Sequence, residues 1–317
     1  MASFPPPTQI QTIDPATYTA VPAHLRELKR KPHSQLIYGG KVVDVFIEGP
    51  IIVPGTNELF VVDIPNGRIL AVELKTLQWR CVVEYDGEPN GMAWHPGKKL
   101  ILIADRHRGI VTLDLQAQRD EDKVQFPLPS FNGEPFKGCN DLVVGHDGSV
   151  FFTDQGQTGL QDPTGRVFRW HMDGRLDLLL RNGISPNGLV LSRDEKTLFV
   201  AMTRDNAIWA LPIYPDGSIQ RTVRFSSYYG LGGPDGMTMD SEGNVFVAHV
   251  SLGTIFVHKP NGEPLATIRS NLGTATTNLT WGGDDFKTLF ITESESGTIL
   301  YVRWHCKGYL GQIYNEF

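Results

Sequence analysis

Six polar side chains recur along the chain, each at the start of a short apolar run. They are Glu48 in FIEGPIIV, Asn90 in EPNGMAW, Asn140 in GCNDLVV, Asn187 in SPNGLVL, Asp235 in GPDGMTM and Asn278 in TTNLTW. Two are carboxylates and four are amides, so each offers an oxygen donor. Hard divalent cations such as Ca²⁺ and Mg²⁺ prefer these donors over sulfur or imidazole. If the fold brings the six together, the sequence predicts a divalent-metal site.

The same residues have a simpler interpretation as turn formers. Asn and Asp before Gly tolerate the left-handed backbone conformation and bond to nearby backbone groups. This alternative accounts for any single copy. It does not require Glu48 before Gly-Pro or Asn278 before Leu-Thr-Trp, so convergence of all six on a common target is the stronger hypothesis.

The elements that must position these residues follow from an internal repeat. Successive copies are separated by 42, 50, 47, 48 and 43 residues. Each copy continues with a second β-rich segment and then a third, for example KTLFVAM and NAIWALPI after Asn187. A fourth strand per copy is expected in the more variable stretches, such as residues 77–85 and 175–182. Periods of this length are typical of stacked or radial repeats.

The repeat predicts an all-β fold, a six-bladed β-propeller with a central metal site. Parallel α/β folds are disfavoured because no long helical crossover separates the strands. In a propeller the innermost strand of each blade lines the central channel, so equivalent polar residues would form a ring. We expect a single propeller domain over residues 41–317. Residues 1–40 would form an N-terminal extension that packs on the propeller or closes it, with one short helix at residues 23–31.

Composition excludes several classes of function. The 317 residues are 40% hydrophobic and 20% charged, and the net charge of −6 gives no basic footprint for nucleic acid. No secretion signal or membrane-spanning run is visible, so we expect a cytoplasmic protein, a monomer or small homo-oligomer, with a small-molecule substrate. Cys81, Cys139 and Cys306 lie far apart without a CxxC pattern. Neither a zinc site nor a disulfide framework is therefore predicted.

Taken in order, the repeated segments resemble the senescence marker protein, gluconolactonase and regucalcin family of six-bladed propellers. The resemblance runs from about residue 44 to 304. It is carried by EGP (48–50), CNDLVVGHDGSVFFTD (139–154), SPNGLVLSRDEKTLFVA (185–201), GPDGMTMDSEGNVFVA (233–248) and TNLTWGGDDFKTLFIT (277–292).

The resemblance implies a divalent metal in the channel and roles for individual residues. Glu48, Asn187 and Asp235 would be metal ligands, with Asn140 as fourth ligand or substrate-binding neighbour. Asp235 would also act as general base or nucleophile. Asn90 and Asn278 would face the substrate.

Two positions depart from the relatives that the sequence resembles. Sugar-lactone hydrolysing members often carry Arg two residues before the Asn140 position, where this chain has Gly138. The GCND segment is closer to the related diisopropyl-fluorophosphatase branch, whose members have a channel His where this chain has Thr280. The substrate of neither branch can therefore be transferred.

Other candidate residues lie at the ends of second strands. His249 follows an apolar run and could relay a proton near a metal-bound water, whereas His107 is interpreted as a solvated loop residue. Arg106 and Arg108 could bind a substrate carboxylate, although solvation is the favoured interpretation of the pair. Trp281 is expected to pack between blades.

These observations predict a divalent-metal-dependent hydrolase of a small lactone or related cyclic ester. The metal, Ca²⁺ first and Mg²⁺, Mn²⁺ or Zn²⁺ as alternatives, would polarise the carbonyl while Asp235 or His249 activates water. The first alternative keeps the metal in a lyase, isomerase, cyclase or phosphoester hydrolase. The second is a non-catalytic calcium-binding propeller.

Overall fold

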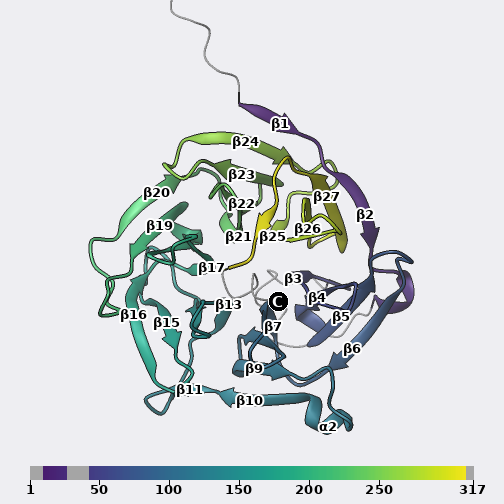
Figure 1. The fold of residues 1–317 in the computed structure, drawn as a ribbon, viewed down its shortest axis with the longest axis horizontal. Coiled ribbons are helices and arrows are strands. Elements are labelled where there is room, and N and C mark those ends of the chain that lie inside the picture. Colours follow the sequence, from purple (N-terminus) through teal and green to yellow (C-terminus); the bar gives the residue numbers. More distant parts are fainter. Residues whose placement is uncertain (1–9, 27–42, 312–317) are drawn as a thin grey trace, which may run out of the picture.

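Short runs of Val, Ile, Leu and Phe pair with their neighbours in the chain because Gly- and Asp-containing turns separate them. The computed structural model describes residues 10–26 and 43–311. Within these residues, six antiparallel sheets are arranged around a central axis (Figure 1). The predicted six-bladed β-propeller is confirmed, and β3, β7, β13, β17, β21 and β25 are the blade strands that lie toward the axis.

The blades follow one another in chain order, and the first three are built as follows. Blade one comprises β3 (Ile47–Ile52), β4 (Glu58–Asp63), β5 (Arg68–Glu73) and β6 (Trp79–Glu84). Blade two comprises β7 (Pro89–His95), β8 (Leu100–Asp105), β9 (Gly109–Leu113) and β10 (Val124–Leu128). Blade three comprises β13 (Cys139–Val144), β14 (Val150–Asp154), β15 (Gly165–Trp170) and β16 (Leu176–Gly183).

The remaining blades repeat this order. Blade four comprises β17 (Pro186–Leu191), β18 (Thr197–Met202), β19 (Ala207–Pro212) and β20 (Val223–Ser227). Blade five comprises β21 (Gly233–Asp240), β22 (Val245–Val250), β23 (Thr254–His258) and β24 (Pro264–Arg269). Blade six has three strands from this part of the chain, β25 (Thr276–Gly282), β26 (Thr288–Glu293) and β27 (Thr298–Arg303).

The N-terminal segment completes the ring. Strand β2 (Ala16–Ala20) pairs antiparallel with β27 as the outer strand of blade six, and β1 (Gln11–Ile13) pairs parallel with β24 of blade five. Near the other end of the described chain, β28 (Gly308–Tyr309) pairs with β21. Residues 11–20 are thus integrated into two blades, which covers sheet edges that would otherwise be exposed.

The elements outside the blades are short. They are the 3₁₀ turns η1 (Ala23–Leu25), η2 (Ile64–Asn66) and η3 (Thr203–Asp205), helix α2 (Asp120–Lys123), and the β-ribbon of β11 (Ser130–Phe131) and β12 (Glu134–Pro135). The helix predicted at residues 23–31 is reduced to η1 in the described part, and its remainder from residue 27 lies outside the described residues. Among the helices that the structure describes, none has the length and apolarity needed to cross a membrane.

The hydrophobic core is divided among the six interfaces between adjacent blades. Each buried cluster combines side chains from two neighbouring blades, and neighbouring residues of one strand serve opposite interfaces because strand side chains alternate. Phe152 faces blade two, for example, whereas Phe151 faces blade four. Packing between blades therefore fixes the inner strands relative to one another.

Candidate active site

The six repeated polar residues lie at equivalent irregular points of the inner strands. In every blade the pairing between the first and second strands shifts register near this residue, at Glu48/Ile51, Pro89/Met92, Cys139/Leu142, Pro186/Leu189, Pro234/Met237 and Thr276/Asn278. A bulge bends the strand and redirects the side chain that it contains. Five of the six, all except Asn278, line one cavity of about 400 Å³.

The glycines that follow these residues are needed for close approach, not for a turn. Gly91, Gly188 and Gly236 lie inside strands, and none of them has a positive φ angle. A Cβ on Gly91 would lie 2.0 Å from Oδ1 of Asp141, and a Cβ on Gly188 would lie 2.3 Å from the carbonyl oxygen of Asp235. The turn interpretation is therefore wrong for these copies, because the glycine lets neighbouring inner strands meet at the axis.

Glu48 and Asp235 place two buried carboxylates at the cavity. Glu48 accepts hydrogen bonds from the backbone N–H of Gly49 and, at 2.9 Å, from Nδ2 of Asn278. Burial nevertheless raises the pKa of Glu48 to about 7. The pKa of Asp235 is also raised well above its ordinary value, mainly by burial and then by the charges of Glu48 and Asp141. A hydrogen bond from Asn187 partly opposes this increase.

Asp141 is a third carboxylate that the sequence reasoning missed. It follows Asn140 at the position where four other blades have glycine, and its carboxylate lies between Gly91 and Asn278. Burial, and then the charge of Glu48, raise its pKa to about 8. The available signal was the break from Asn-Gly to Asn-Asp in GCND. Three acids thus share a buried space, a costly arrangement that a bound cation would relieve.

Asn140 supplies the clearest sign of a missing partner. Its Nδ2 donates to Oε1 of Gln155 at 2.9 Å, and Gln155 in turn donates to the hydroxyl of Ser185 at 3.0 Å. Because the network uses the Nδ2 of Asn140, only its Oδ1 is still able to accept a hydrogen bond. This Oδ1 is buried and has no hydrogen-bond partner. Buried polar atoms are seldom left unpaired, so this oxygen fits a ligand for an ion.

Asn278 lies beneath the cavity and not on its wall. Its Nδ2 contacts carboxylate oxygens of Glu48 and, at 3.4 Å, of Asp141, while its Oδ1 accepts from the backbone of Leu279. Both ends of the amide therefore have partners within the protein. The structure does not bring Asn278 to the cavity surface that a substrate would contact, whereas Asn90 lines that surface.

Two arginines line the cavity beside the carboxylates, Arg106 and Arg204. The side chain of Arg106 is 13% exposed, its nearest ion-pair contact to Glu88 is 3.8 Å, and its Nε is buried without a hydrogen-bond partner. Its Cγ would lie 3.2 Å from a Cβ at Gly138, which has a φ of +146°. The Arg106 side chain, from a loop of blade two, therefore lies beside Gly138, the position at which sugar-lactone hydrolysing relatives often carry Arg.

The histidine candidates lie away from the cavity surface. His249 is fully buried, its ring packs against Tyr228 and Phe256, and its Nδ1 contacts the carbonyl of Val250 at 2.8 Å. Burial lowers its pKa. His249 occupies the strand-end position that carries Asp63 in blade one. It is not among the lining residues of the cavity, so the structure does not bring it to Asp235.

The other candidates are placed as follows. His107 is 45% exposed on its loop, with Nε2 3.2 Å from Glu88. Arg108 bonds to Asp86 outside the cavity. Trp281 is fully buried and packs edge-on against Phe246 between blades five and six, as predicted.

The donor set fits a hard divalent cation. Carboxylate oxygens come from Glu48 and Asp235, amide oxygens from Asn140 and Asn187, and all four side chains line the same cavity. Among the described residues that line this cavity, none is a cysteine, methionine or histidine. The orphaned Oδ1 of Asn140 and the raised carboxylate pKa values are independent indications of the same electrostatic need.

The fold is a six-bladed propeller in which five of the repeated inner-strand residues line one cavity. Residues 46–295 match the model of the SMP-30/Gluconolactonase/LRE-like region, and the chain belongs to this family. It is 35% identical over 225 residues to a gluconolactonase of Zymomonas mobilis, covering 65% of this chain and 61% of that relative. It is 25% identical over 264 residues to the diisopropyl-fluorophosphatase of Loligo vulgaris, covering 77% and 82% respectively.

Solved structures show the same fold. A calcium-binding protein, regucalcin, from Agrobacterium tumefaciens superposes with a TM-score of 0.73 over 96% of this chain and 98% of its own, at 17% identity. At that identity the likeness concerns the fold alone.

Proposed function

We propose that the protein is a divalent-metal-dependent hydrolase of a small lactone or related cyclic ester. The observation that carries the proposal is the cluster of three buried carboxylates beside the unpartnered amide oxygen of Asn140. Relatives named gluconolactonase, lactonase drp35 and pentonolactonase support the reaction type.

Glu48, Asn140, Asn187 and Asp235 would hold the metal. We propose Ca²⁺, because all four donors are oxygens and because regucalcin, which has the same fold, is described as calcium-binding. When bound, the ion supplies Lewis-acid polarisation of the substrate carbonyl.

Asp235 is the group best placed to accept a proton from water. Its carboxylate lines the cavity with the other proposed ligands, so it can accept a proton from a water bound there. The water oxygen then bonds to the carbonyl carbon, the ring C–O bond breaks, and the ring oxygen takes up a proton to give a hydroxy acid. Because His249 lies outside the cavity, we assign no proton transfer to it.

Arg106 and Asn90 would position the substrate. Both line the cavity, where the Arg106 guanidinium and the Asn90 amide can each donate a hydrogen bond to a substrate oxygen. Sugar-lactone relatives often carry Arg at the position of Gly138. In this chain Arg106, from the neighbouring blade, would supply the guanidinium at the cavity.

The test is a panel of small lactones assayed with the Ca²⁺-loaded protein in water labelled with ¹⁸O. Hydrolysis incorporates one labelled oxygen into the acid product, whereas a lyase or isomerase incorporates none. The expected result is labelled hydroxy acid from at least one lactone. A folded, Ca²⁺-loaded protein that gives no labelled product from any lactone would overturn the proposal.

A second candidate is phosphoester or phosphofluoridate hydrolysis with the same residues. It is favoured by the similarity to diisopropyl-fluorophosphatase, which covers 82% of that relative. Assaying diisopropyl fluorophosphate beside the lactones separates the two, since the released product is fluoride in one case and a hydroxy acid in the other.

A further inference from the structure

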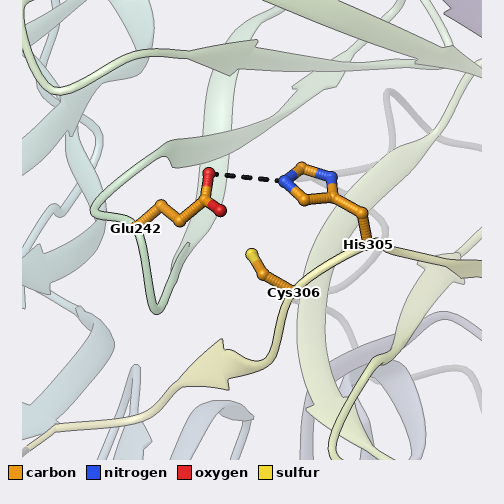
Figure 2. Close-up of side chains that lie close together, drawn as sticks. All are labelled: Glu242, His305 and Cys306. Carbon is orange, nitrogen blue, oxygen red and sulfur yellow. Dashed lines mark hydrogen bonds and ion pairs between the residues drawn. The ribbon is translucent and has the colours of Figure 1, made fainter.

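A second group of metal-ligand side chains lies at the other end of the blades (Figure 2). Glu242 is in the turn between β21 and β22, whereas His305 and Cys306 follow β27. Their ligand atoms all lie within 4.8 Å of one another, and Oε2 of Glu242 is 3.3 Å from Nε2 of His305. Strand β21 separates Glu242 from Asp235, a distance on the order of 20 Å at the usual rise of a strand. The group is therefore distinct from the cavity.

The chemistry of this group differs from that of the cavity. A thiol, an imidazole and a carboxylate are the three ligand types that Zn²⁺ uses, and a thiolate disfavours Ca²⁺. In a tetrahedral zinc site the ligand atoms lie roughly 3.3–3.6 Å apart, given usual bond lengths. Side-chain rotation therefore has to close the present separations of up to 4.8 Å. The glutamate and histidine side chains are each 57% exposed, and the His305 ring also lies 4.8 Å from the ring of Trp304.

The backbone that carries the three ligands is already held in place. The N–H of Ser241 donates to the carbonyl of Lys307 at 2.8 Å, which joins the two segments directly. Nε1 of Trp304 donates to Oδ2 of Asp240 at 3.0 Å, and Nζ of Lys287 donates to the carbonyl of His305 at 2.9 Å. Because these contacts order the segments without a metal, binding has to order only side chains.

We propose that Glu242, His305 and Cys306 form a Zn²⁺ site that fastens the segment after β27 to blade five. Solvent supplies the fourth ligand, because the three protein ligands lie at the surface. Binding replaces the proton of the Cys306 thiol, which passes to solvent. The segment leads directly into β28, which pairs with β21, so the bound ion would strengthen this last strand pairing.

Cobalt binding tests the thiolate directly, because Co²⁺ replaces Zn²⁺ and gives a sulfur-to-metal charge-transfer band. We expect the band in the wild-type protein and in Cys81→Ser, which removes an exposed cysteine elsewhere. We expect it to vanish in Cys306→Ser. Absence of the band in the wild type, its persistence in Cys306→Ser, or its loss in Cys81→Ser would each overturn the proposal.

Zinc titration by calorimetry tests the other two ligands and separates this site from the cavity. Glu242→Gln and His305→Gln change exposed side chains, so both variants should fold and their zinc affinity can be measured. Each should weaken the Cys306-dependent Zn²⁺ binding by at least the roughly 10–100-fold that loss of a supporting residue causes at metal sites. Asn187→Ala, which alters the cavity, should leave this binding unchanged. Unchanged zinc affinity in both surface variants, or its loss in Asn187→Ala, would contradict the assignment.

Discussion

The two ends of the inner strand β21 carry two different kinds of metal-ligand group. At its start, Asp235 joins buried oxygen donors from several blades. Beyond its end, Glu242 meets an imidazole and a thiol at the surface. The residues of the first group occupy equivalent positions in successive blades. The second group combines the turn between β21 and β22 with the segment that follows β27.

The difference shows how burial and donor type select a cation. Buried carboxylates with raised pKa values need a positive charge and exclude soft donors, which favours Ca²⁺. The partly buried thiol of Cys306 and the exposed imidazole of His305 are softer donors, which favours Zn²⁺. If this comparison holds, a substitution in the cavity weakens Ca²⁺ binding and leaves Zn²⁺ binding unchanged, and a substitution in the surface group does the reverse.

The largest effect is expected for the proposed base. Asp235→Asn keeps the size of the side chain but cannot accept the proton, so kcat/KM for a lactone substrate should fall roughly 100- to 10,000-fold. Cys306→Ser, at the other end, should leave kcat/KM unchanged. Full activity in a folded Asp235→Asn protein would show that the cavity is not the catalytic centre.

Calcium affinity provides the second comparison. Asn187→Ala removes an amide oxygen from the cavity and the hydrogen bond to Asp235, so the Ca²⁺ dissociation constant should rise at least roughly 10–100-fold. His305→Gln is the matched variant at the far end and should bind Ca²⁺ as the wild type does. Calorimetric titration measures both, and equal losses in the two variants would remove the distinction between the sites.

Close approach at the axis predicts a stability effect. Gly91→Ala places a Cβ 2.0 Å from the Asp141 carboxylate, which should lower the free energy of unfolding by about 1–3 kcal/mol. At Gly97 the nearest atom to an added Cβ is 3.5 Å away, so Gly97→Ala should change it by less than about 0.5 kcal/mol. Denaturant unfolding distinguishes them. Equal stability of the two variants would contradict the requirement for glycine at position 91, because it would mean that the Asp141 side chain can move away from an added Cβ without cost.

The last comparison concerns pH and the metal-free protein. Glu48 and Asp141 have pKa values of about 7 and about 8 in the folded state, so the fold binds their protons more tightly than the unfolded chain does. Their contribution to the free energy of unfolding is fully present below the ordinary carboxyl pKa values of about 4. It decreases as pH rises from there and is lost once pH has passed the folded-state values of about 7 and about 8. Chelated protein should therefore lose thermal stability over this range.

Calcium should reverse this dependence, because the ligands bind it in their deprotonated form. Thermal melts at several pH values, with chelator and with Ca²⁺, provide the measurement. A chelated protein that becomes more stable between roughly pH 5 and 9 would contradict the burial of these acids.

Much of the architecture followed from the sequence because it depends on a repeated pattern. The period, the strand composition and the alignment of Glu48 with the later copies predicted six blades and one set of inner-strand residues. Most of that set meets in one cavity because each blade repeats the same bulge. The placement of Asn278 beneath the cavity could not be predicted, because its hydrogen bonds to Glu48 and Asp141 depend on distances across the axis.

Other features depended on departures from the repeat. The alignment of second strands already placed His249 in line with Asp63, whose side chain is fully buried and bonds to Phe46. Only the structure shows that side chains at this strand-end position are buried, so the proton-relay hypothesis could not be rejected from the sequence. Cys306 and Glu242 are distant in sequence, so a search for local zinc spacing could not associate them.

The most direct test of the proposed centre is lactone hydrolysis by Cys306→Ser protein that is stripped with chelator and then titrated with Ca²⁺. In this variant the far-end thiol is absent, so any metal dependence belongs to the cavity. The account predicts that chelation abolishes turnover and that Ca²⁺ restores it. Turnover that survives chelation with no metal bound, in a folded protein, would contradict it.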